Sequence, residues 1–144
     1  MKMNALVEQV AREWIGTPYV HQASVKGAGT DCLGLVRGIW RELYGTEPEA
    51  MPAYTPDWSE PAGAEDLWRA ALRHLRVSER AAPGDVLLFR MREGAVAKHL
   101  GIQSRAGDDP SFIHAFSGHA VVESALTRPW ARRVVARFQF PERG

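Results

Sequence analysis

The sequence contains a single cysteine among its 144 residues, so no disulfide can form within the chain. Its net charge is +1, from 18 basic and 17 acidic residues, and without a basic cluster we expect no nucleic-acid partner. The chain also has no apolar run of about 18 residues and no apolar leader segment. We therefore expect no membrane partner, and synthesis in the cytoplasm without a signal peptide, where a free thiol is stable.

Patterns typical of metal sites are absent as well. The five histidines are scattered, and the sequence has no CxxC, HxxxH or HExxH spacing. A zinc site would need ligands assembled only by the fold. We expect no metal and no other cofactor.

The sequence does contain a helical pattern that begins at its one cysteine. Asp31 is a preferred N-cap residue, Cys32 follows it, and Gly45 stands where a helix C-cap glycine is expected. Apolar residues recur between them at helical spacing, at Leu35, Val36, Ile39 and Leu43. A thiol in the first turn lies near the partial positive charge of the helix, which favours the thiolate. This predicts a reactive cysteine; the competing interpretation is a small buried apolar residue.

Two glycines inside this helix, Gly34 and Gly38, are four residues apart and lie along one side. Each costs about 0.5–1 kcal/mol relative to alanine in a helix interior. We expect another stretch of backbone to pass close to the cysteine end of the helix.

The remaining pattern places helices before strands. Helices are predicted over 3–14 and 65–75, with loops over 20–29 and 45–63. Strands are predicted over 86–89, 98–104, 111–115, 120–124 and 132–140. This order predicts an α+β fold with an antiparallel sheet, in one domain over residues 1–144.

A nucleophilic cysteine needs a base and a group that orients the base. His99 and His114 fall on two predicted strands and can share one face if these strands are neighbours, with His99 as base and His114 as its partner. His21, His74 and His119 are interpreted as surface residues. Two alternatives stay open: His21 lines the site near Tyr19, and His119 is the third member. Spacing alone leaves the Cys32–His99 pair open.

Five segments resemble the NlpC/p60 family of papain-like cysteine peptidases, which cut bacterial cell-wall peptides. In chain order they are Gly-Thr-Pro-Tyr (16–19), Asp-Cys-Leu-Gly-Leu-Val (31–36), Pro-Gly-Asp-Val (83–86), His-Leu-Gly-Ile (99–102) and Ile-His-Ala (113–115). The resemblance implies a papain-like fold, in which the nucleophile helix packs on the C-terminal antiparallel sheet.

The resemblance also implies roles for individual residues. Cys32 is the nucleophile, His99 the base and His114 the third, polar member. Tyr19 matches a tyrosine near the nucleophile that assists the oxyanion, and Asp31 and Leu33 flank the nucleophile in the same region. Leu33 replaces the usual serine, which puts substrate contacts rather than catalysis in question.

The function implied is hydrolysis of a peptidoglycan stem peptide, at the D-glutamyl–diamino acid bond that the family favours. Residues 31–45 look most like the branch encoded with phage tails, which implies tail proteins as partners and delivery to the cell wall for DNA entry. Two alternatives stay open. One is a docking component of the tail that uses the Tyr54–Trp58 aromatics, and the other is a thiol acyltransferase or amidase.

Overall fold

The computed structural model describes residues 2–47 and 65–142. The predicted loop over 45–63 lies almost entirely outside these residues, and its role stays a prediction. The helices are α1 (Lys2–Glu13), α2 (Cys32–Tyr44), α3 (Asp66–His74) and α4 (Arg128–Ala131). The strands are β1 (Ser24–Val25), β2 (Gly29–Thr30), β3 (Arg76–Val77), β4 (Val86–Arg90), β5 (Ala97–Arg105), β6 (Ser111–Ala115), β7 (Val121–Ala125) and β8 (Val134–Gln139).

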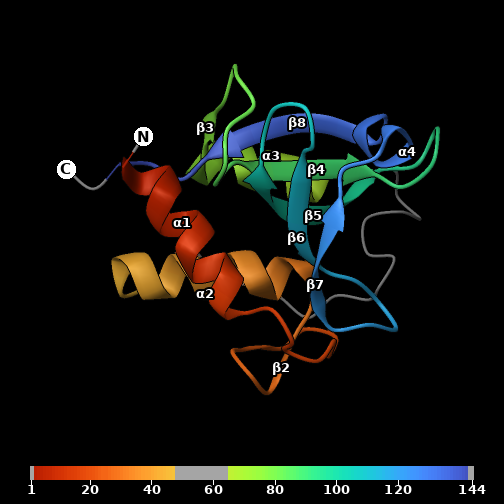
Figure 1. Ribbon diagram of the computed structural model, residues 1–144. Coiled ribbons are helices and arrows are strands. Elements are labelled where there is room, and N and C mark those ends of the chain that lie inside the picture. Colours follow the sequence, from red (N-terminus) through yellow and green to blue (C-terminus); the bar gives the residue numbers. More distant parts are fainter. Residues whose placement is uncertain (1, 48–64, 143–144) are drawn as a thin grey trace.

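Six strands form one antiparallel sheet in the order β3-β8-β4-β5-β6-β7. Helices α1 and α2 lie together on one side of this sheet (Figure 1). Alternating side chains explain the layers: on β4, Val86 and Leu88 join the core beneath the helices, whereas Leu87 and Phe89 belong to a second cluster with Trp130 of α4. The α+β fold with a helix-covered antiparallel sheet is thereby confirmed.

Helix α2 begins and ends where the sequence predicts. The Asp31 carboxylate accepts a hydrogen bond of 2.7 Å from the Gly34 N–H, and Gly45 adopts a left-handed conformation with φ of 83°. A Cβ on Gly34 would lie 1.9 Å from the carbonyl oxygen of Ala23, so a second backbone does pass there. At Gly38 the close neighbour is the Trp14 ring instead, which corrects the expectation for that position.

Four short elements differ from the prediction. The segment interpreted as a loop over 20–29 contains strand β1 and leads into β2, and the two form a hairpin. Strand β3 and helix α4 are also unpredicted. Elements of two to four residues carry no readable periodicity, so only the folded context defines them. Within the described residues, none of the helices has the length and apolar character needed to cross a membrane.

Candidate active site

Cys32 lies against the backbone of β5, where its sulfur contacts the residues immediately before and after His99. Its thiol donates to the Lys98 carbonyl oxygen across 3.7 Å, and the Leu100 N–H faces the sulfur. The ladder between β5 and β6 runs from Ile102–Ile113 outward, so it ends before Lys98 and Leu100. The thiol therefore contacts the part of β5 that precedes its ladder with β6.

This position reverses the pKa shift that the sequence predicts for the thiol. Burial raises the pKa of Cys32 to about 12, and the negative charge of Asp31 adds to the rise, although N–H groups of Leu100, Leu33 and Cys32 itself oppose it. The residue as a whole is only partly buried. In the unliganded protein the thiol is therefore neutral, because desolvation outweighs the helix dipole.

The two predicted histidines form a hydrogen-bonded pair. His99 Nε2 lies 2.9 Å from His114 Nδ1, and both residues are buried, with 8% and 1% of their surface exposed. Burial lowers the pKa of His99 to about 3, with a smaller contribution from His114. Burial, followed by the charge of His119, lowers the pKa of His114 to about 4. Both imidazoles are therefore neutral at pH 7.

Aromatic rings enclose this pair. The Trp130 ring centroid lies 5.9 Å from that of His99 and 5.2 Å from that of His114. Further rings around the histidines belong to Phe89, Phe112 and Phe116. These rings supply the desolvation that keeps the imidazoles uncharged. The sequence gives no signal for Trp130, because α4 is a single turn of four residues, too short to show a helical pattern.

Tyr19 is half-buried beside the nucleophile. Burial raises the pKa of Tyr19 to about 12, with smaller contributions from the charge that Cys32 carries once it is ionised and from the Asp31 carboxylate. The phenol thus keeps its proton at pH 7 and can donate a hydrogen bond near the sulfur, as the resemblance implies. Its role at the oxyanion stays a prediction.

Asp31 and Leu33 have structural positions rather than open ones. The Asp31 carboxylate is 2% exposed and accepts hydrogen bonds from the Gly34 and Gln22 N–H groups, 2.7 Å each. Leu33 is 8% exposed and packs in the core. Asp31 thus caps α2 and Leu33 anchors the helix to the core, and a role of either residue in substrate binding stays a prediction.

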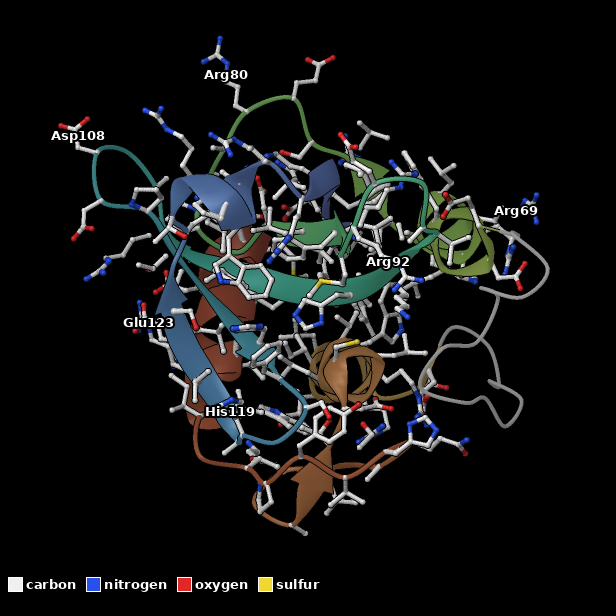
Figure 2. All side chains as sticks on the ribbon, turned by 90° about the vertical axis from the view of Figure 1, so that its right-hand side faces the viewer. Arg69, Arg80, Arg92, Asp108, His119 and Glu123 are labelled. Carbon is white, nitrogen blue, oxygen red and sulfur yellow. The ribbon has the colours of Figure 1, made fainter. Side chains whose placement is uncertain are left out.

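The other histidines lie away from the pair. His119 is exposed on the connection between β6 and β7 (Figure 2) and stacks on Phe116, with ring centroids 5.2 Å apart. His21 is half-buried, and its Nδ1 lies 3.8 Å from the Asp31 carboxylate. His74, predicted to be solvated, is partly buried with its ring edge toward Trp40. Among the described residues, no group of three potential ligands could hold a metal ion.

The site combines a thiol at a helix N-terminus, a buried imidazole pair on neighbouring strands and a protonated phenol. His99 Nε2 is engaged with His114, so Nδ1 is the nitrogen available to take a proton from the thiol. The backbone N–H groups of Cys32 and Leu33 face the sulfur and stand where a developing oxyanion could be bound. Fold and site together define a papain-like cysteine hydrolase arrangement.

The chain belongs to the NlpC/P60 family, whose pattern matches residues 16–139. Similar curated proteins include gamma-DL-glutamyl hydrolase of Bacillus subtilis (strain 168), 31% identical over 86% of this chain and 26% of that protein. Another is murein DD-endopeptidase MepS/murein LD-carboxypeptidase of Escherichia coli (strain K12), 31% identical over 92% of this chain and 63% of that protein. The chain thus spans about a quarter of the length of the Bacillus subtilis protein and less than two thirds of the length of the Escherichia coli protein.

Solved structures share the fold. The NlpC/p60 domain of the peptidoglycan hydrolase SagA superposes with a TM-score of 0.61 at 22% identity, covering 95% of this chain and 98% of that domain. A protein similar to lipoprotein, of the NLP/P60 family, from Staphylococcus aureus gives a TM-score of 0.62 at 16% identity. That match covers 99% of this chain and 42% of the other.

Proposed function

We propose that this protein is a cysteine endopeptidase that hydrolyses peptide bonds in the stem peptides of peptidoglycan. The observation that carries the proposal is the contact of the Cys32 thiol with the backbone of the two residues that flank His99 on β5. His99 is itself hydrogen-bonded to His114. Family membership and the names of the curated relatives, a murein endopeptidase and a glutamyl hydrolase, support the same substrate class.

The reaction begins with a neutral thiol and a neutral imidazole. As the Cys32 sulfur attacks the carbonyl carbon, the thiol proton moves to His99 Nδ1, and the carbonyl oxygen becomes an oxyanion near Tyr19 and the helix N–H groups. The carbon–nitrogen bond then breaks, and His99 gives its proton to the leaving amine. Water, deprotonated by His99, attacks the resulting thioester, which releases a carboxylate and restores the thiol.

The bond we propose is the one between D-glutamate and the diamino acid. The relationship to a glutamyl hydrolase supports this choice, whereas the relationship to a murein DD-endopeptidase supports a cross-link instead. The two bonds give fragments of different mass, so one digestion distinguishes them.

The test is digestion of purified peptidoglycan, with soluble fragments identified by mass spectrometry. Wild type should release stem-peptide fragments ending in D-glutamate, and Cys32→Ala and His99→Ala should release none. His74→Ala is the matched histidine control, because His74 lies on α3 against Trp40, and it should retain activity. Fragments from Cys32→Ala as well, or none from a folded wild type, would refute the proposal.

We further propose that a phage-like tail carries the protein to the cell wall, where it acts in the periplasm or wall and contacts other tail proteins. The support is the resemblance of residues 31–45 to tail-associated members of the family. Mass spectrometry of purified particles from a producing culture should find the protein with tail components. Its recovery only outside the particles would contradict delivery by a tail.

A further inference from the structure

A third polar side chain continues the hydrogen-bonded series beyond the histidine pair. His114 uses both ring nitrogens: Nδ1 lies 2.9 Å from His99 Nε2, and Nε2 lies 2.9 Å from Ser124 Oγ. Ser124 is on β7, which pairs with β6 so that His114 lies opposite Val122. Figure 2 shows the neighbouring Glu123 on this strand. Sequence patterns give no signal for Ser124, because its partner is defined by the register of two strands.

We propose that Ser124 is a positioning residue that fixes the tautomer of His114, and through it the tautomer of His99. The inference rests on the proposed function only for its kinetic consequence, because the hydrogen bonds exist without substrate.

The argument follows the protons along the series. A neutral imidazole carries one proton, so one ring nitrogen donates and the other accepts. To receive the thiol proton, His99 must have a bare Nδ1, which places its own proton on Nε2, toward His114 Nδ1. His114 Nδ1 must then accept, so the His114 proton lies on Nε2, toward Ser124. Ser124 must therefore supply an acceptor, and its hydroxyl oxygen has the lone pairs to do so.

The opposite arrangement would disable the base. If the proton of His114 moved to Nδ1, that nitrogen would compete with His99 Nε2–H, and His99 would be favoured as the Nδ1–H tautomer. His99 Nδ1, the nitrogen proposed to take the thiol proton, would then already hold a proton. Both histidines are neutral, buried and enclosed by aromatic rings. Water therefore does not readily replace His114 Nδ1 as the acceptor for His99 Nε2–H. A hydroxyl can donate as well as accept, so the productive arrangement requires the Ser124 oxygen to act as the acceptor for His114 Nε2–H across the 2.9 Å contact.

The first experiment needs no substrate. Nitrogen-15 NMR of the histidine rings in wild type should show His114 and His99 both as Nε2–H tautomers at pH 7. In Ser124→Ala, a substantial Nδ1–H fraction should appear at His114. Ser124→Thr keeps a hydroxyl at this position and should restore the wild-type tautomers. A wild-type His114 in the Nδ1–H form would overturn the proposal, whatever the variants do.

The second experiment measures turnover on peptidoglycan fragments. Ser124→Ala should lower kcat by about tenfold, the scale of one lost hydrogen bond, with little change in KM. Ser124→Thr should recover most of the rate. Ser117→Ala, in the exposed connection between β6 and β7, is the matched serine control and should be unchanged. Unchanged kcat and tautomers in a folded Ser124→Ala would refute the role. An inactive wild type that shows the expected tautomers would refute the proposed function alone.

Discussion

The thiol of Cys32 donates to the carbonyl oxygen of Lys98 across 3.7 Å, one residue before the histidine that would be its base. The first turn of α2 is thereby held against β5 in the unliganded protein. The thiol proton points toward a backbone acceptor in this resting state. The same contact buries the sulfur and accounts for its raised pKa.

Alkylation of Cys32 should follow from this resting state. Because the pKa of the thiol is raised to about 12, the thiolate fraction is small at pH 7 and grows about tenfold for each pH unit. The rate of reaction with iodoacetamide should therefore rise steadily from pH 6 to pH 10. Measuring the rate by intact-protein mass, with Cys32→Ala as the blank, tests this. A plateau between pH 5 and 8 would indicate a thiolate–imidazolium pair instead.

Stability should decrease toward acid pH because of the two buried histidines. The pKa of His99 is lowered to about 3 and that of His114 to about 4, so both stay neutral in the folded state while the unfolded chain gains protons below pH 6.5. The free energy of unfolding should fall between pH 6.5 and 5, by up to about 2 kcal/mol for each histidine.

Urea unfolding at pH 7, 6 and 5 measures this dependence. Replacing His99 by glutamine removes one of the two proton-binding groups, so His99→Gln should show a shallower decrease than wild type over the same range. An identical decrease in both proteins would show that His99 does not titrate in this way.

The sequence predicts those features of this molecule that local chemistry determines. The capping residues Asp31 and Gly45 define the ends of α2, and β6 spans the residues predicted for that strand. What it could not predict depends on contacts between distant segments. The β1–β2 hairpin, the enclosing Trp130 and the Ser124 partner of His114 each exist only because the chain folds back. The predicted direction of the pKa shift of the Cys32 thiol was wrong for the same reason, because burial beside β5 is a tertiary effect.

Gly34→Ala should reduce both stability and activity. An added methyl group would lie 1.9 Å from the Ala23 carbonyl oxygen, and a backbone atom can move only with its loop. Overpacking of this kind costs about 1–3 kcal/mol, and the shift would displace the helix end that carries Cys32. Thermal unfolding and peptidoglycan digestion measure the two effects.

Gly38→Ala is the matched comparison within the same helix. Its methyl group would meet the Trp14 ring at 2.2 Å, about one turn farther from Cys32 than Gly34 is, so it should reduce stability with less effect on turnover per folded molecule. Equal activity per folded molecule in wild type and Gly34→Ala would contradict the positional argument.

The buried carboxylate of Asp85 should matter more to stability than any exposed charge. Asp85 is 0% exposed; its carboxylate lies 2.8 Å from an Arg137 Nη1 and accepts hydrogen bonds from Asn4 at 3.0 Å and Ser78 at 3.2 Å. These contacts join α1, the turn before β4 and strand β8. The Arg137 side chain is only 20% exposed, so removing the negative charge leaves a largely buried cation without its partner.

Asp85→Asn keeps the shape of the side chain and removes its charge, and should lower the free energy of unfolding by about 3 kcal/mol. Asp109→Asn is the control: this aspartate is 86% exposed and 3.7 Å from Arg105, so its loss should change stability by less than about 0.5 kcal/mol. Urea unfolding of the three proteins at pH 7 compares them directly. Similar small losses in both variants would mean that the Asp85 contacts hold the helices to the sheet through hydrogen bonds that asparagine can also make, rather than through charge.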